Sequence, residues 1–116
     1  MNKTLADLVE ELCRKLKEEN KMELMKQCQI WNENDEYQKI IDALEAIPSQ
    51  ERTPEMDSEL ARAYSNVAEP GDRELLKKAI SLLEPHEEYF TGDHYWNFRM
   101  GYSYYYLDRR AAPCVL

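Results

Sequence analysis

Apolar residues recur at steps of three and four along most of this chain. The first such stripe lies in residues 4–16, where Thr4 and Asp7 have the spacing of a capping box. It consists of Leu5, Leu8, Val9, Leu12 and Leu16. An amphipathic helix is therefore predicted at residues 1–20. Met22, Met25 and Cys28 continue the spacing toward Trp31, and only Asn20 offers a weak break, so the pattern leaves open whether residues 4–32 form one helix or two.

Four more amphipathic segments follow, each with start or stop signals. The first has an apolar face and stops at Pro48, and the second takes Pro54 as its first helical residue. That first face comprises Tyr37, Ile40, Ile41, Leu44 and Ile47. Each segment also has a candidate cap, namely Asn34 or Asp35, Thr53, Asp72 and Asp93. The last helix begins at His94.

Length and composition agree with this helical pattern. The chain has 116 residues, which fits a single domain over residues 1–116, and only three Gly and five Pro, which leaves little material for tight hairpins. We predict an all-α fold of five to six helices. Short connections between such helices favour an up-and-down stack or an α-solenoid.

An internal match favours the solenoid. The stretches LARAY and MGYSY, forty residues apart, each place a large apolar residue, a small residue and a tyrosine at the same spacing. The matched residues are Leu60, Ala61 and Tyr64, and Met100, Gly101 and Tyr104. Over residues 21–110 the chain resembles the tetratricopeptide-repeat (TPR-like) family, in particular a small bacterial branch of it. The resemblance implies antiparallel helix-turn-helix units forming a short right-handed α-solenoid.

Some features depart from that family pattern. The usual period is about 34 residues, so the second unit would carry an insertion near AEPGDR, and the first unit fits poorly. After residue 110 the chain offers only AAPCVL, residues 111–116, in place of another amphipathic helix. The last helix would then be unpaired, and a homodimer through that helix is one hypothesis.

The resemblance also assigns a function to seven aromatic residues between Tyr95 and Tyr106. In this family the first helix of each unit lines a concave groove. The groove positions here would be Glu55, Ser58, Arg62, Ser65, Asn66, Tyr95, Phe98, Tyr102, Tyr105 and Tyr106. The opposite, packing face of the last helix would be Trp96, Met100, Gly101, Tyr104 and Leu107.

Burial is the competing explanation for the tyrosines. Aromatic residues at helical spacing more often belong to a core than to a binding site, and an amino-terminal helix folded back into the groove would cover them with Leu and Val. Burial of at least half of them is therefore the first expectation. Tyrosine nevertheless suits a binding groove, because it offers a large contact area at little cost in rotamer entropy.

Charge narrows the class of partner. Acidic side chains outnumber basic ones by 23 to 15, a net charge of −8, which repels the phosphates of nucleic acids. No run reaches the about 18 apolar residues that a membrane span requires, and no signal peptide is evident, so a cytoplasmic protein without membrane contact is predicted. A protein or peptide with basic flanks is the expected partner.

Catalytic and metal-binding motifs are weak. Cys13, Cys28 and Cys114 lack C-x-x-C spacing and read as small hydrophobes. HEEYF, which begins at His86, has Phe90 where a zinc-protease motif needs a second histidine. We therefore expect no enzyme, no cofactor and no metal site.

Three functions remain open at this stage. The first is a non-enzymatic interaction module that binds a protein segment in the tyrosine groove. The second is a bacterial toxin-immunity or inhibitor protein, whose acidic charge would speed association with a basic effector. The third is a self-assembling structural repeat.

Overall fold

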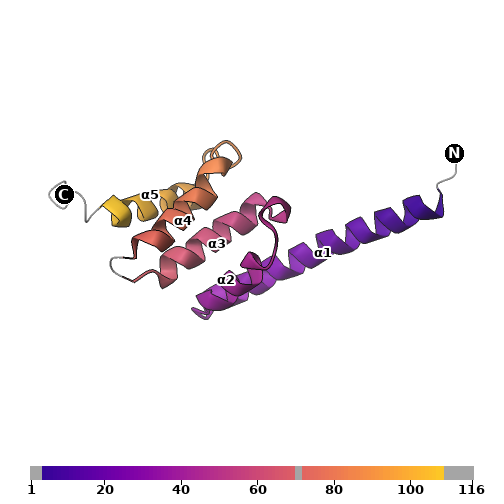
Figure 1. The fold of residues 1–116 in the computed structure, drawn as a ribbon, viewed down its shortest axis with the longest axis horizontal. Coiled ribbons are helices and arrows are strands. Elements are labelled where there is room, and N and C mark those ends of the chain that lie inside the picture. The colour runs from indigo at the N-terminus through magenta and orange to yellow at the C-terminus, as the bar shows by residue number, and fades with distance from the viewer. Residues whose placement is uncertain (1–3, 70–71, 109–116) are drawn as a thin grey trace.

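The computed structural model describes residues 4–69 and 72–108, and every regular element in these ranges is helical (Figure 1). The five α-helices are α1 (Leu5–Glu33), α2 (Tyr37–Glu45), α3 (Pro54–Val67), α4 (Arg73–Leu83) and α5 (His94–Asp108). Two short 3-10 turns, η1 (Ser49–Glu51) and η2 (Glu84–His86), lie in the connections before α3 and after α4. The predicted all-α class is confirmed. The tail at residues 111–116 lies outside the described ranges.

Helix α1 settles whether residues 4–32 form one helix or two, because it is continuous for 29 residues. The predicted capping box is present: Thr4 Oγ1 accepts the Asp7 amide at 3.2 Å, and the Asp7 carboxylate accepts the Thr4 amide at 3.3 Å. The first half of α1 extends beyond the other helices in Figure 1. Of residues 4–20, all but the half-buried Glu11 are exposed.

Three of the four later caps are also confirmed. Side-chain oxygens of Thr53, Asp72 and Asp93 accept backbone amides three residues on, at 3.2, 3.3 and 2.8 Å. The cap predicted for α2 is wrong: its N-cap is Glu36, which makes no side-chain capping bond. Asp35 instead takes a left-handed backbone conformation, with φ of 58°, and accepts a hydrogen bond from the Tyr37 hydroxyl at 2.9 Å. This tight turn ends α1 and reverses the chain.

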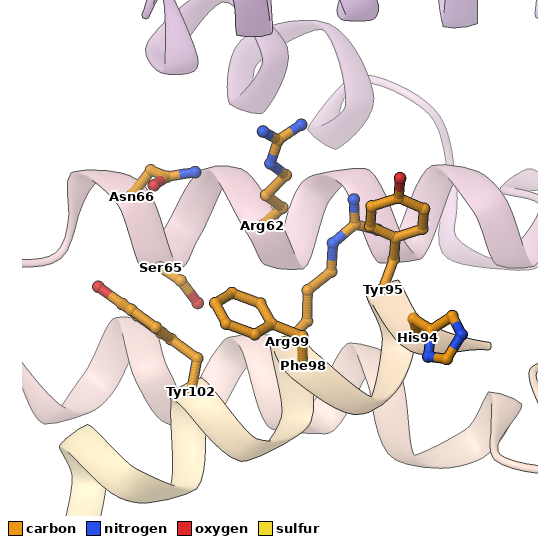
Figure 2. A pocket seen from close by; sticks show the side chains of 8 residues that line it. All are labelled: Arg62, Ser65, Asn66, His94, Tyr95, Phe98, Arg99 and Tyr102. Carbon is orange, nitrogen blue, oxygen red and sulfur yellow. The ribbon is translucent and has the colours of Figure 1, made fainter. Parts of the chain in front are cut away.

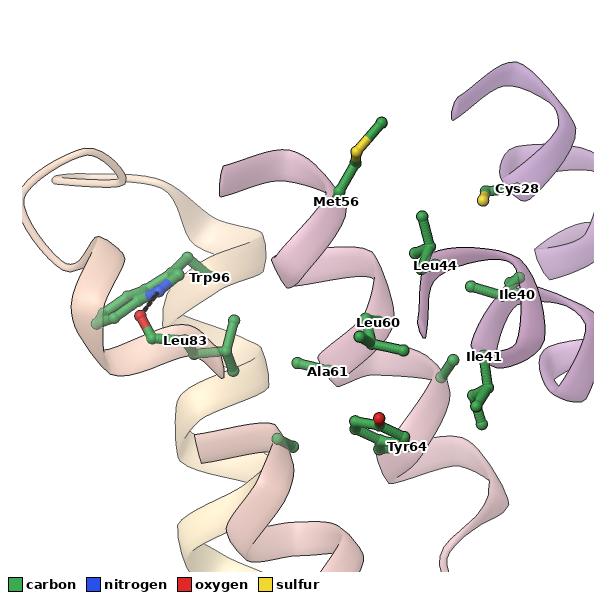
Figure 3. Close-up of a cluster of buried hydrophobic side chains, with 12 residues drawn as sticks. Cys28, Ile40, Ile41, Leu44, Met56, Leu60, Ala61, Tyr64, Leu83 and Trp96 are labelled. Atoms are coloured by element: carbon green, nitrogen blue, oxygen red, sulfur yellow. Dashed lines mark hydrogen bonds between the residues drawn. The ribbon is translucent and has the colours of Figure 1, made fainter. Parts of the chain in front are cut away.

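The core forms where consecutive helices pack on one another. Helix α3 packs between α2 and α4, α4 packs on α5, and α3 also contacts α5. The largest fully buried hydrophobic side chains are Ile40, Leu44, Met56, Leu60 and Leu83, most of which lie on predicted apolar faces (Figure 3). Ala61, Ala63 and Ala79 are also fully buried. Small side chains at these positions allow α3 to lie close to its neighbours.

A buried ionic cluster fixes the connection that leads into α3. The Asp57 carboxylate accepts hydrogen bonds from Arg52 Nε at 2.7 Å and lies 2.8 Å from His86 Nε2. Arg52 also donates to the Ile47 carbonyl oxygen at 2.9 Å. The cluster therefore joins the α2–α3 connection, the first turn of α3 and η2. His86, the first residue of HEEYF, belongs to this structural contact.

Trp96 anchors α5 to α4. Its ring is buried, and its indole Nε1 donates to the Leu83 carbonyl oxygen at 2.9 Å (Figure 3). At the other end of the helix, Arg73 Nη1 donates to the Leu107 carbonyl oxygen at 2.6 Å. The predicted packing face of α5 is thus only partly used, because Gly101 and Tyr104 are exposed whereas Trp96 is buried.

Replacing each of two glycines with alanine should change the free energy of unfolding in opposite directions. Gly101 lies within α5, and a Cβ there would meet no atom within 4 Å. Gly101→Ala should therefore raise the free energy of unfolding by about 0.5–1 kcal/mol, since alanine favours the helix. Gly92 has φ of 81°, a conformation that alanine disfavours, so Gly92→Ala should lower the free energy of unfolding by about 1–2 kcal/mol. Urea unfolding followed by circular dichroism measures both; equal effects of the two changes would contradict this assignment.

Candidate functional site: a groove across three helices

A cleft of about 580 Å³ lies between α3 and α5 (Figure 2). Its lining residues are Arg62, Ser65, Asn66, His94, Tyr95, Phe98, Arg99 and Tyr102. Tyr95 and Phe98 are 73% and 71% exposed, and both rings stand at the cleft with Tyr102 in Figure 2. Large apolar rings are thus held at a concave surface, where they can be covered by a ligand.

A second cleft, of about 470 Å³, adjoins the first and extends to α1. Arg62, Tyr95 and Arg99 line both clefts. The other residues lining the second cleft are Met25, Lys26, Gln29, Asn32 and Glu59. Together the two clefts make one concave surface across α1, α3 and α5, which we call the groove.

Glu59 is the centre of the polar network in the groove. Its two carboxylate oxygens accept hydrogen bonds from Arg99 Nη2 at 3.1 Å and from Asn32 Nδ2 at 2.7 Å. Arg62 Nη1 lies 4.0 Å from the same carboxylate. Glu59 of α3 therefore connects α5 with α1 across the groove.

The side chain of Arg99 is well buried at the base of the groove. Its guanidinium also donates to the Ser58 hydroxyl, and its side chain is only 15% exposed. Burial lowers the pKa of Arg99 from its usual value, and the neighbouring Glu59 carboxylate opposes that shift. Arginine remains charged in proteins, so Arg99 is a fixed positive charge held in place by two residues of α3.

One buried hydrogen-bond acceptor beside this network receives no hydrogen bond from the described residues. Within the described part of the chain, the buried Oδ1 of Asn32 has no hydrogen-bond partner, although its Nδ2 donates to Glu59. A buried amide oxygen without a donor costs free energy.

The aromatic rings form a row along α5. The centroids of Phe98 and Tyr102 are 6.1 Å apart, those of Tyr102 and Tyr106 are 4.6 Å apart, and Tyr105 lies 5.0 Å from Tyr106. The guanidinium of Arg99 lies 5.9 Å from the Tyr95 ring centroid, within the range of a cation–π contact. Rings that support one another in this way lose little further entropy when a ligand covers them.

The structure brings six of the ten predicted groove residues to the first cleft. These are Arg62, Ser65, Asn66, Tyr95, Phe98 and Tyr102. Tyr105 and Tyr106 lie further along α5 and are 41% and 42% exposed. Ser58 is buried under Arg99, and Glu55 is exposed and accepts a hydrogen bond from the Tyr89 hydroxyl.

The expectation that at least half of these tyrosines are buried is wrong. Tyr95, Tyr104, Tyr105 and Tyr106 are all exposed, and Tyr102 is half-buried. The reason lies in α1, which does not fold back. The half of α1 that carries the leucine stripe projects away from the other helices, so no described segment covers the rings (Figure 1).

Sequence reasoning missed the contribution of α1 to the groove. Met25, Gln29 and Asn32 lie at i, i+4 and i+7 and thus share one helix face. That spacing was available in the sequence. The first unit nevertheless fits the repeat pattern poorly, so no groove positions could be assigned there. Glu59, half-buried in α3, was missed for a different reason: its role depends on Arg99, forty residues away.

Cys28 should be far less reactive than Cys13. The Cys28 side chain is fully buried, and burial, followed by the negative charge of Glu59, raises the pKa of its thiol to about 11. Only a small fraction is then thiolate at pH 8, whereas Cys13 is exposed. Alkylation at pH 8 followed by peptide mass mapping should modify Cys13 and leave Cys28 unmodified until urea is added. Equal labelling of the two in native protein would contradict the burial of Cys28.

Other kinds of site find no support in the described ranges. No group of three or more His, Cys, Asp and Glu side chains there could hold a metal ion. No described helix has the length and apolar character to cross a bilayer. His94 begins α5 and is exposed at the end of the first cleft.

Comparisons with known proteins add no relative from which to infer the function. No family model matches the chain, and no curated protein or solved structure matches it.

Proposed function

We propose that this protein is a non-enzymatic interaction module that binds a protein or peptide segment in the groove. The observation that carries the proposal is the exposed row of rings on α5 beside a concave surface across three helices. Aromatic side chains that are already positioned and not covered by the protein itself are typical of binding hot spots.

We further propose that the helices are TPR-like repeats in a short right-handed α-solenoid. Supporting this, each helix from α2 to α4 packs on the next one in sequence, and α3 and α5, which would be the first helices of two successive units, contact each other. Ala61 and Ala79, at the small-residue positions of two helices, are fully buried. In such an array the groove corresponds to the surface lined by the first helices of successive units.

The chemistry of the groove specifies the partner. The rings would take apolar side chains of a helix or an extended peptide. Arg62, whose side chain is 40% exposed, suits a peptide carbonyl or carboxylate. Because the chain as a whole carries −8, basic residues flanking the bound segment would speed association.

A displayed library of random 12-residue peptides tests the proposal. Peptides selected on the wild-type protein should bind with dissociation constants in the micromolar range. Tyr102→Ala should weaken their binding at least about tenfold, the effect expected from removing a hot-spot ring. Calorimetric titration of the two tightest-binding peptides measures their dissociation constants for the wild-type protein and for the Tyr102→Ala variant.

Tyr89→Ala is the matched control. Tyr89 is another tyrosine, 60% exposed, but it lies outside the groove, before α5. Its change should leave peptide affinity unaltered, and neither variant should shift the melting temperature by more than a few degrees. Failure to select any peptide, or equal losses in the two variants, would refute the groove as the binding site.

A further inference from the structure

The first half of α1 carries a second apolar surface that is separate from the groove. We call residues 4–20 the α1 arm. Its five large apolar residues are exposed: Leu5 by 78%, Leu8 by 50%, Val9 by 52%, Leu12 by 59% and Leu16 by 49%. Figure 1 shows the arm projecting away from the other helices. No described helix packs on this stripe.

A helix of this kind is not stable by itself in water. An isolated segment of this length forms a helix only marginally, and most helices depend on packing of their apolar face. A continuous stripe of five exposed large apolar residues is also the kind of surface patch that marks an interaction site. The α1 arm therefore requires a partner surface.

We propose that this partner is the α1 arm of a second copy of the chain, paired in the antiparallel direction. Leu5, Val9, Leu12 and Leu16 are spaced four, three and four residues apart, which is the seam of a two-stranded coiled coil. The spacing reads the same in both directions. An antiparallel pair thus places Leu5 opposite Leu16 of the other copy and Val9 opposite Leu12, so that all four positions are filled.

The charges along the arm favour the same direction. Residues 4–10 contain Asp7 and Glu10, a charge of −2. Residues 11–17, which lie opposite residues 4–10 of the other copy in this register, contain Arg14, Lys15 and Lys17 against Glu11, a charge of +2 (three minus one), and Glu18 and Glu19 lie beyond this overlap. An antiparallel pair sets each negative half beside a positive half, whereas a parallel pair sets like charges side by side.

The rest of the molecule adds a further reason. Each chain carries a net charge of −8, and the packed helices lie at one end of a molecule 68 Å long. A parallel pair would place the two acidic sets of packed helices at the same end of the paired arms, where they repel each other. An antiparallel pair keeps them at opposite ends of the paired arms and leaves both grooves open.

Sedimentation equilibrium of the full chain up to about 1 mM tests the pairing. The wild-type protein should show a reversible monomer–dimer equilibrium, and Leu12→Glu should raise its dissociation constant at least about 30-fold, because it places a charge in the seam. Met22→Glu is the control: Met22 is an exposed apolar residue of the same helix, 62% exposed, but lies outside the overlap. It should leave the equilibrium unchanged.

A distance measured between spin labels on the two copies determines the direction of pairing. In a Cys13→Ser, Cys114→Ser background, a spin label at Lys26→Cys would lie about 46 Å along the helix axis from its counterpart in an antiparallel dimer. In a parallel dimer the two labels would lie within roughly 20 Å. The long distance supports the proposal and the short one overturns the antiparallel arrangement.

Two other results would overturn the pairing itself. One is a wild-type chain that stays monomeric over the whole concentration range. The other is a dimer that survives Leu12→Glu but dissociates with Tyr106→Glu, which would place the contact on α5. Circular dichroism of each variant checks that the helix content is retained.

Discussion

Replacing Asp57 with alanine should lower the free energy of unfolding by about 3–5 kcal/mol, a large part of the stability of a domain this size. The Asp57 carboxylate is buried, 8% exposed, and is the anion shared by Arg52 and His86. Its removal leaves the Arg52 guanidinium, whose side chain is 11% exposed, buried without its anion. Chemical denaturation followed by circular dichroism measures the loss.

Glu55→Ala serves as the control for this prediction. Glu55 is also an acidic residue in the first turn of α3, but it is exposed. Its loss should change the free energy of unfolding by no more than about 0.5 kcal/mol. Comparable losses for Glu55→Ala and Asp57→Ala would show that the first turn needs only negative charge, and that the buried cluster contributes little.

Trp96→Ala should lower the free energy of unfolding by a similar amount, about 3–5 kcal/mol. The change empties the space between α4 and α5 and removes the hydrogen bond to the Leu83 carbonyl oxygen. Because Trp96 holds α5 in place, one wall of the groove should loosen before the rest of the fold. Backbone amide exchange should therefore accelerate more in α5 than in α3.

Phe98→Ala provides the comparison within the same helix. Phe98 is 71% exposed, so its truncation removes much less buried surface than that of Trp96, which is 8% exposed. The free energy of unfolding and the amide exchange of α5 should stay close to wild type. If Phe98→Ala destabilised the protein as much as Trp96→Ala, the two faces of α5 would have been assigned the wrong way round.

Local signals in the sequence were sufficient to predict where most helices begin. Thr53 with Pro54, Asp72 and Asp93 mark three starts correctly, since a cap acts on amides only three residues away. The exception is the turn before α2. There Asp35 adopts a positive φ instead of capping, which depends on how α1 ends and α2 packs.

The groove was predictable only in part. Repeat spacing placed Arg62 and Tyr102, forty residues apart, at groove positions of two helices, and both line the first cleft. The burial of Ser58 and the role of Glu59 were not predictable, because both depend on where the Arg99 guanidinium lies. Contacts between residues far apart in sequence have no local signature.

The sequence by itself determined the helical class, most helix starts and the apolar face of each helix, because these depend on periodicity and on side chains within one turn. Only the tertiary structure decided which apolar faces are covered. Leu60 and Leu5 both lie on such faces, yet Leu60 is buried between helices and Leu5 is exposed on the α1 arm. The tyrosines of α5 are exposed for the same physical reason: burial requires a neighbouring element, and the leucines of the continuous α1 project away from the other helices (Figure 1).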